Sequence, residues 1–365
     1  MILHIAPDYM NKPIYRHLIE GLQATNGTAQ CVFACDNAIH DVQNIPQNVY
    51  VVNHPFSVFE RLLFFPKQRY LLKEIEKTVP LEQIDLIHAH TLFSSGYLAY
   101  RLHKKYGIPY IVAVRNTDVN VFFRYMRHLR HIGKKIAKHA QKIIFISPAY
   151  KEQVLGTYLP QTITGKSIVL PNGIDPIFLQ RRTKHEPDRT TIRLIYIGRI
   201  EKDKNINTII RVADQLVQNR QPVALCLVGK IIDAHYASMI KNRSYITWHD
   251  QCAKEEVLQY LQQNDIFIMP SYHETFGLVY AEAMSQGLPL VYTKGQGFDG
   301  FFEDGCVGYA VPSDNVSYIT SKVMDIHRHY NTFSERCVQN VSQFDWQNIV
   351  KNYTIIYQDC PHGTR

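Results

Sequence analysis

The sequence predicts an α/β protein made of two Rossmann-like domains. Short apolar runs of β type alternate with amphipathic helical segments along most of the chain. The alternation stops at Val169–Asp175, where Pro171-Asn172-Gly173 is strong turn chemistry, and it begins again near Ile192. A chain of 365 residues is long enough for two domains with complete cores.

The first half is predicted to form a parallel sheet with helices between its strands. Expected strands are Met1–Ile5, Cys31–Ala34, Val49–Val52, Ile84–His88, Tyr110–Val114 and Ile143–Ser147, and expected helices are Ile14–Gln23, Gly96–Tyr106 and one that begins at Pro148. Ligands of such sheets bind beyond the carboxyl ends of the strands. The loops Pro7–Lys12, His88–Ser95 and Arg115–Asn120 are therefore candidates to border a site.

The second half repeats the pattern. Expected strands are Ile192–Ile197, Ala224–Val228, Ile246–Trp248, Ile266–Met269 and Leu290–Tyr292, and expected helices are Ile206–Val217, Lys254–Gln262, Leu278–Gln286 and, near the end, Trp346–Tyr357. The helix Leu278–Gln286 is expected to end at Gly287, a residue that readily adopts a left-handed cap.

The loop before that helix has the composition of an anion site. It delivers Phe276, Gly277 and Leu278 to a helix N-terminus, where N–H groups and the helix dipole favour phosphate. Glu274 precedes the helix and Glu282 lies about one turn into it, so the two carboxylates cannot share a helical face. We expect them to contact different parts of one ligand: a sugar at Glu274, a diphosphate at the helix start and a ribose at Glu282.

This stretch resembles family 4 of the retaining, nucleotide-sugar-dependent glycosyltransferases, also described as glycosyl transferases group 1. The residues that carry the resemblance are Pro270-Ser271, Glu274, Phe276-Gly277-Leu278, Glu282-Ala283-Met284, Gly287 and Pro289. The resemblance implies the GT-B fold, in which two Rossmann-like domains face each other across a cleft. It places an acceptor domain at residues 1–172 and a donor domain at 173–345, with a C-terminal helix at about 346–365 that crosses back to the acceptor domain.

The resemblance also assigns roles to individual residues. Catalytic candidates are Glu274, Arg199, Lys204 and Asp118, and donor-binding candidates are Gly198, Arg199, Lys204, Glu274, Thr275, Phe276, Gly277, Leu278 and Glu282. The guanidinium of Arg199 and the ammonium of Lys204 suit a departing diphosphate, although Lys202 lies close in sequence to Lys204. Because these cations and helix N–H groups can neutralise the diphosphate, no metal and no other cofactor is expected.

The first half departs from the family pattern in two loops. The loop after the first strand lacks the glycine pair of many relatives, and Asn11 or Lys12 can take its place beside the phosphates or the acceptor. A histidine found in many relatives is replaced by Arg115, whereas Asp118 is kept. Arginine cannot act as a base, but it can hold a phosphate or an acidic sugar. His90 is expected either to face the cleft or to be structural.

Charge is unevenly distributed along the chain. Residues 1–175 carry 20 Lys and Arg against 12 Asp and Glu, whereas residues 176–365 carry 20 of each, so the excess of +8 lies in the first half. The segments Phe56–Leu72 and Phe122–Lys142 mix bases with aromatics, and the second is predicted to be a basic helix. Since no nucleic-acid motif is present, we expect an anionic membrane surface as the partner.

The expected function is transfer of a sugar, with retention of configuration, from a nucleotide-sugar to a glycan or lipid-linked acceptor in surface polysaccharide synthesis. UDP is the expected nucleotide because uridine donors are commonest in the family. The seven cysteines form no metal or disulfide pattern, which favours a cytoplasmic protein, peripheral at the inner face of the membrane. Two alternatives stay open: a nucleotide-sugar epimerase of the same fold, and a non-catalytic subunit that binds the nucleotide-sugar.

Overall fold

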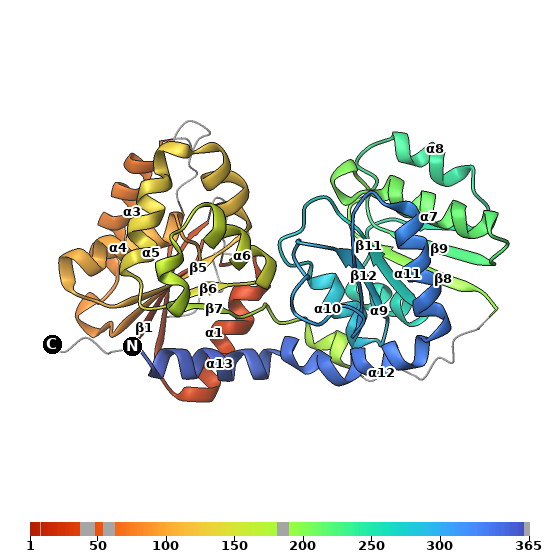
Figure 1. Ribbon diagram of the computed structural model, residues 1–365. Coiled ribbons are helices and arrows are strands. Elements are labelled where there is room, and N and C mark those ends of the chain that lie inside the picture. The colour runs from red at the N-terminus through yellow and green to blue at the C-terminus, as the bar shows by residue number, and fades with distance from the viewer. Residues whose placement is uncertain (8, 37–47, 54–62, 181–189, 361–365) are drawn as a thin grey trace. The chain divides into compact units, whose positions relative to one another are not determined.

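The computed structural model describes residues 1–7, 9–36, 48–53, 63–180 and 190–360. Its internal contacts divide the chain into two units (Figure 1). Unit 1 comprises Met1–Ile146, Lys151–Asn172 and Trp346–Arg365, and unit 2 comprises Ser147–Tyr150 and Gly173–Asp345. The expected domain limits at 172/173 and 345/346 coincide with limits of these units, and Ser147–Tyr150 is the one segment grouped differently.

Unit 1 is built on a parallel sheet in the order β3-β2-β1-β4-β5-β6-β7. Its strands are β1 (Ile2–Ile5), β2 (Gln30–Asp36), β3 (Val49–Asn53), β4 (Leu86–Ala89), β5 (Tyr110–Val114), β6 (Ile143–Phe145) and β7 (Ser167–Val169). The helices are α1 (Pro13–Asn26), α3 (Phe64–Thr78), α4 (Ser94–Tyr106), α5 (Arg130–His139), α6 (Pro148–Thr157) and α13 (Trp346–Gln358). Crossovers on both faces bury the central strands, which explains their continuous apolar runs.

Unit 2 has a second parallel sheet in the order β10-β9-β8-β11-β12-β13. Its strands are β8 (Ile192–Ile197), β9 (Val223–Val228), β10 (Ile246–His249), β11 (Ile266–Met269), β12 (Leu290–Thr293) and β13 (Gly308–Val311). The helices are α7 (Ile206–Gln218), α8 (His235–Lys241), α9 (Lys254–Gln262), α10 (Leu278–Ser285), α11 (Val316–Arg328) and α12 (Tyr330–Asn340). The strand order reverses between β8 and β11, and ligands of open α/β sheets bind at such a reversal.

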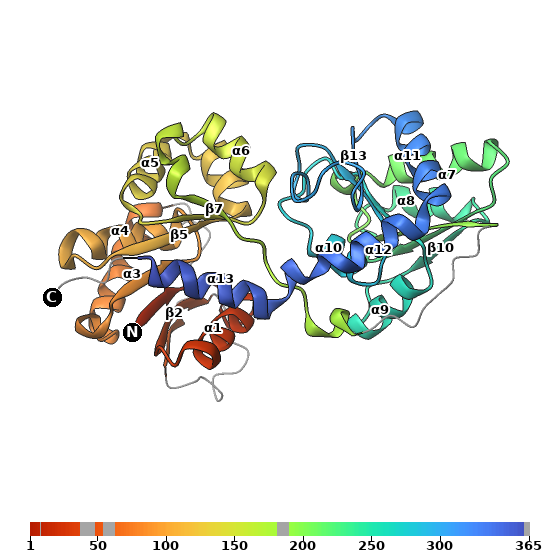
Figure 2. The same ribbon diagram turned by 60° about the horizontal axis from the view of Figure 1, so that its bottom comes forward.

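The last helix, α13, returns to unit 1 and packs against α1 (Figure 2). Ile349, Val350 and Tyr353 of α13 share a core with Leu18 and Leu22 of α1. The two helices approach closely at Gly21, because a β-carbon at that position would lie 2.6 Å from Cγ2 of Val350. This confirms the predicted C-terminal helix and its membership of the first Rossmann-like unit.

The prediction of one basic helix over Phe122–Lys142 was wrong. The chain instead forms the end of a π-helix, η3 (Asp118–Phe123), then a 3₁₀ turn, η4 (Arg127–Leu129), and only then α5. Met126 leaves the helical region with φ −95° and ψ 59°, and the Arg130 Nε–H donates to the Phe123 carbonyl across the break at 2.7 Å.

Two further expectations concern membranes and the basic segments. In the part of the chain that the structure describes, no helix has the length and apolar character to cross a bilayer. The portion of the segment Phe56–Leu72 that precedes Leu63 lies outside the described residues.

Candidate functional site

A pocket of about 340 Å³ opens in unit 2 at the carboxyl ends of β8 and β11. Five of the predicted donor-site residues line it: Gly198, Lys204, Glu274, Leu278 and Glu282. The other lining residues are Phe178, Ile197, Lys254, Val257, Met269 and Val279. The pocket therefore combines an apolar wall with two ammonium groups and two carboxylates.

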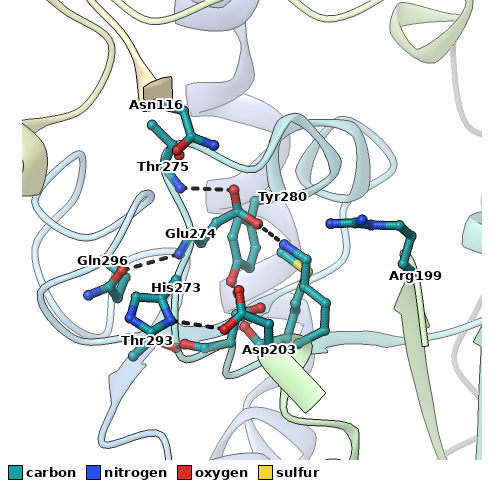
Figure 3. Close-up of polar contacts among 12 residues, drawn as sticks. Asn116, Arg199, Asp203, His273, Glu274, Thr275, Tyr280, Thr293 and Gln296 are labelled. Carbon is teal, nitrogen blue, oxygen red and sulfur yellow. Dashed lines mark hydrogen bonds and ion pairs between the residues drawn. The ribbon is translucent and has the colours of Figure 1, made fainter. Parts of the chain in front are cut away.

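Glu274 sits in the loop between β11 and α10, and its backbone is held through both its N–H and its carbonyl (Figure 3). Its backbone N–H donates to Oε1 of Gln296 at 3.2 Å, and its carbonyl accepts from the N–H of Gly297 at 2.8 Å. Gly277 then turns the chain into α10 with φ 73°. Only glycine suits this point, since an added β-carbon would lie 2.6 Å from the Tyr280 ring.

The carboxylate of Glu274 forms an ion pair with Lys204, with Nζ and Oε2 2.8 Å apart (Figure 3). Both side chains are less than one-fifth exposed, so the pair is shielded from solvent. Asn205 fixes the lysine loop, because its Nδ2 donates to the Pro270 carbonyl at 2.9 Å and its backbone is left-handed, with φ 58°. Of the two candidate lysines, Lys204 is therefore the one the fold directs to the pocket.

A second contact joins the same two loops. The Tyr272 N–H donates to the Asp203 carbonyl at 3.1 Å, and the His273 ring lies 3.0 Å from the Asp203 carboxylate (Figure 3). The loop carrying Lys204 and the loop carrying Glu274 are thus joined by backbone and side-chain contacts as well as by the ion pair. This makes the pair a preorganised feature of the pocket.

Arg199 is placed differently from Lys204. Its side chain is 66% exposed and pairs with Glu201 at 2.8 Å, and it is absent from the described lining of the pocket. In Figure 3 its guanidinium end turns towards the side of the site where Glu274 lies. An exposed ion pair of this kind contributes little stability, so the guanidinium can change partners at small cost.

Glu282 occupies the α10 side of the pocket. Burial raises its pKa from the ordinary value of 4.5 to about 7, the Lys254 ammonium opposes this shift, and the Asp175 carboxylate adds to it. Lys254 donates to Asp175, which caps the short helix η6 (Pro176–Leu179) by accepting from the Ile177 N–H. A half-buried carboxyl with a pKa near neutrality, beside a lysine, is well suited to accept hydroxyl hydrogen bonds.

The remaining predicted donor residues form the support of the pocket. The Thr275 N–H donates to Oε1 of Glu274 at 2.9 Å and so orients that carboxylate. Phe276 is buried and packs against Phe298, Phe301 and Phe344. Together they hold the N-terminus of α10 at the pocket, where its N–H groups and dipole favour an anion.

Asp118, in unit 1, is fully buried. Its carboxylate accepts from the backbone N–H groups of Leu92, Phe93 and Arg115 at 2.9, 3.0 and 2.8 Å. Burial raises its pKa to about 6, and the three N–H bonds oppose the shift. These contacts describe a positioning residue that ties the start of α4 to the end of β5, and its predicted catalytic role stays a prediction.

His90 is also fully buried, in a cluster with His4 and His88. The Gln30 Nε2 donates to the Thr28 carbonyl at 2.7 Å, which orients the Gln30 amide so that its Oε1 accepts from His4 Nε2 at 2.8 Å. Because His4 Nε2 carries the proton, the other ring nitrogen, Nδ1, accepts from His90 Nε2 at 3.0 Å. Burial lowers the pKa of all three rings, that of His4 to about 4. Of the two roles considered for His90, the contacts favour the structural one.

This cluster has a poor geometry for a metal. The rings of His88 and His90 stack with centroids 3.9 Å apart, and the lone pairs of stacked imidazoles run side by side instead of converging on one ion. The expectation that the reaction needs no metal is a separate matter, and it stays a prediction.

The other predicted residues of unit 1 lie at the carboxyl edge of its sheet. Arg115 follows β5, and its Nη1 donates to Oδ1 of Asn172 at 2.6 Å, while its buried Nε–H meets no acceptor among the described residues. Asn11 and Lys12 are exposed between β1 and α1, with Lys12 at the N-cap.

The residues that line or support the pocket and were not predicted from the sequence as site residues include Asn205, Lys254, Gln296 and Gly297. The glycine pair at Gly295 and Gly297 was the only available signal, because the others act through contacts between segments far apart in sequence.

The two halves of the chain match two different protein-family models. Residues 15–178 match the family model described as Glycosyltransferase Family 4, and residues 179–343 match the model described as Glycosyl transferases group 1. An uncharacterized glycosyltransferase of Methanocaldococcus jannaschii is 22% identical over 322 residues, which cover 87% of each chain.

Two further matches have named ligands or activities. The alpha-monoglucosyldiacylglycerol synthase of Acholeplasma laidlawii is 26% identical over 274 residues, covering 67% of this chain and 66% of that protein. The structure of Anabaena HepE in complex with UDP has a TM-score of 0.72 at 16% identity and covers 98% of this chain and 100% of that one.

Proposed function

The chain belongs to the glycosyl transferases group 1, on the GT-B fold, and from this premise we propose a specific reaction. The protein transfers a hexose from a UDP-sugar to a glycan or lipid-linked acceptor, with retention of the anomeric configuration and without a metal. The observation that carries the proposal is the shielded Lys204–Glu274 pair in the lining of a pocket that Glu282 also lines.

The donor would lie with its diphosphate at the N-terminus of α10. There the first N–H groups of the helix, Lys204 and the movable guanidinium of Arg199 face the developing negative charge. Glu274 would accept hydrogen bonds from hydroxyls of the donor sugar, and Glu282 from the ribose hydroxyls. Since fixed cations and N–H dipoles supply the charge stabilisation, the reaction has no need of a divalent ion.

A front-face route fits this arrangement. The bond between the anomeric carbon and the diphosphate oxygen breaks as a bond from the acceptor oxygen forms on the same face. The acceptor proton passes to an oxygen of the departing phosphate, so UDP leaves with the proton and no enzyme nucleophile is needed. Lys204 has a partner before and after this step, because it returns to Glu274 when the diphosphate leaves.

Support for UDP comes from a relative of the same fold, Anabaena HepE, whose structures contain UDP and UDP-glucose. Support for a lipid-linked acceptor comes from the alpha-monoglucosyldiacylglycerol synthase.

The experiment that tests this proposal is a thermal-shift panel of UDP-, GDP- and ADP-sugars in EDTA, repeated on Glu282→Ala. A nucleotide present at about 100 times its dissociation constant stabilises the folded protein by about 2.7 kcal/mol.

Each result of that panel has a distinct meaning. A shift with UDP-sugars alone that is lost in Glu282→Ala supports the donor, the site and the absence of a metal. A shift that requires Mg²⁺ contradicts metal independence. No shift with any nucleotide contradicts the proposed donor site. A shift without transfer to any acceptor favours the non-catalytic subunit, and turnover of the donor without an acceptor favours the epimerase.

We also propose that the protein lies in the cytoplasm and associates with the inner face of the membrane through unit 1. Exposed apolar side chains there include Leu63, Phe65, Val121 and Tyr125, the last 69% exposed with Arg124 over its ring. The rings of Phe64 and Phe122 lie 5.9 Å apart, so the start of α3 adjoins η3. No acidic residue occurs between Asp118 and Glu152, so every Lys, Arg, Asp or Glu in residues 119–151 is a base.

Membrane association is tested by co-sedimentation with vesicles of a zwitterionic lipid, with or without an anionic lipid. Tyr125→Ser removes the most exposed ring, whereas Tyr318→Ser is a matched control on α11 of unit 2, where the ring is 37% exposed. Binding that needs the anionic lipid and is weakened only by Tyr125→Ser supports the proposal. Equal binding of the two variants, or no binding at low salt, contradicts it.

A further inference from the structure

A second, smaller pocket lies in unit 1, at the carboxyl ends of β1 and β2 and between α3 and α4. Its volume is about 60 Å³, and Phe33, Leu71 and Leu98 are among the apolar residues that line it. Because ligands of parallel α/β sheets bind beyond the carboxyl ends of the strands, this pocket stands where unit 1 is expected to bind a ligand.

The polar residue of greatest interest in this pocket is Gln68 of α3. It is 1% exposed, and its Oε1 is buried without a hydrogen-bond donor among the described residues. Gln30, the other buried glutamine at the sheet of this unit, differs, because its amide both donates to Thr28 and accepts from His4. A buried acceptor without a donor destabilises the folded protein, so Gln68 is better suited to receive a ligand hydroxyl than to stabilise the fold.

The start of α4 also lines this pocket, with Ser94 and Ser95. The hydroxyl of Ser95 accepts from Thr91 at 3.1 Å, which leaves its own hydrogen available for donation. An anion is not favoured at this helix start. The Asp118 carboxylate already accepts from the N–H groups of Leu92 and Phe93, and the Thr91 side chain accepts from the Ser95 N–H at 3.0 Å.

We propose that this pocket binds an uncharged sugar of the acceptor through its hydroxymethyl group, and this deepens the glycosyltransferase function proposed above. A volume of about 60 Å³ is far below the roughly 300–1,000 Å³ of pockets that hold a whole small-molecule ligand, so it suits one small group such as a hydroxymethyl. The hydroxyl hydrogen is donated to Gln68 Oε1, the hydroxyl oxygen accepts from the serines, and the carbon packs on the apolar wall.

The test uses the full-length protein and free methyl glycosides. Binding of methyl gluco-, galacto- and mannopyranosides and of their 6-deoxy counterparts is measured by saturation-transfer NMR, with and without UDP. At least one hexoside should bind, and its 6-deoxy form should bind roughly tenfold more weakly, since a site that pairs a hydroxyl discriminates against its loss. Gln68→Leu should lose at least tenfold in affinity without lowering the melting temperature.

Two control variants make the outcome decisive. Gln30→Leu breaks a satisfied network and should lower the melting temperature, and the exposed Gln218→Leu on α7 should change neither property. The proposal is overturned if no hexoside binds, if the 6-deoxy sugars bind equally well, or if Gln68→Leu is destabilised like Gln30→Leu while binding persists. The UDP-induced thermal shift of Gln68→Leu reports separately on the donor site, so the two proposals can fail independently.

Discussion

Replacing Glu282 by glutamine should stabilise the protein at neutral and alkaline pH while it weakens nucleotide binding. The folded pKa of about 7 lies above the ordinary value of 4.5, so between these values the unfolded chain ionises while the folded protein holds its proton. Stability contributed by this group is complete below pH 4.5, falls as the pH rises, and reaches its minimum above pH 7. Glutamine does not ionise, so the variant does not lose this stability as the pH rises.

The expected size follows from the same two values. One pKa unit corresponds to about 1.4 kcal/mol, so the interval from 4.5 to about 7 amounts to roughly 3.5 kcal/mol at most. Relaxation and solvent access reduce this, and we expect Glu282→Gln to exceed the wild type by about 1–3 kcal/mol at pH 8 and to equal it near pH 4.5. Comparing variants at each pH removes the contributions of other titrating groups.

The two tryptophans allow the effect to be assigned to one unit. Trp248 lies in β10 of unit 2 and Trp346 begins α13 in unit 1. Urea unfolding of a Trp346→Phe background, followed by fluorescence, therefore reports on unit 2, where Glu282 resides. A stability difference that does not change between pH 5 and pH 8 would refute the reasoning, because it would mean that folding does not perturb this carboxyl.

Three further variants test other contacts. Lys204→Met should weaken UDP binding at least tenfold and slow transfer by about 10²-fold, because it removes a preorganised charge, whereas Lys202→Met should change little in isothermal titration and rate assays. Asp118→Asn should lower the free energy of unfolding by about 2 kcal/mol in urea unfolding of a Trp248→Phe background. The two carboxylate oxygens of Asp118 accept from three backbone N–H groups, and the substitution replaces one of these oxygens with an NH₂ group, which cannot accept. Gly21→Ala should cost about 1–3 kcal/mol in the same assay, since the new methyl would lie 2.6 Å from Val350.

Contrary results would be informative in each case. Equal losses in Lys204→Met and Lys202→Met would place the diphosphate away from the Glu274 pair. An Asp118→Asn variant with full stability but no transfer would restore the catalytic role predicted from the sequence. A neutral Gly21→Ala would show that α13 shifts easily on α1.

The parts of the fold set by local pattern were predictable. Tyr110–Val114, Ile192–Ile197 and Lys254–Gln262 begin and end at the predicted residues, because continuous apolar runs and a periodic helix are properties of adjacent residues. The strands β7 and β13 were missed. Ser167–Val169 has only three residues, and Gly308–Val311 opens with a glycine that the neighbouring Leu290 carbonyl approaches.

The site shows the same distinction. The motif was enough to predict that Glu274, Lys204 and Glu282 lie in one site, and all three line one pocket. Their role in binding a donor stays a prediction. The burial of Asp118 and the pairing of Arg199 with Glu201 could not be predicted from the sequence motif. The donors to Asp118 include Leu92 and Phe93, about 25 residues earlier in the chain, and such contacts depend on how β4 and β5 are aligned.

The return of α13 to unit 1 also affects how the protein is made. A ribosome releases residues from the N-terminus onward, so the sheet of unit 1 emerges long before the helix that covers Leu18 and Leu22. Unit 2, which ends at Asp345, is complete earlier than unit 1. Nascent unit 1 must therefore wait with an uncovered apolar stripe, and a chain that stops at Asp345 would carry a finished unit 2 attached to an unfinished unit 1 prone to aggregation.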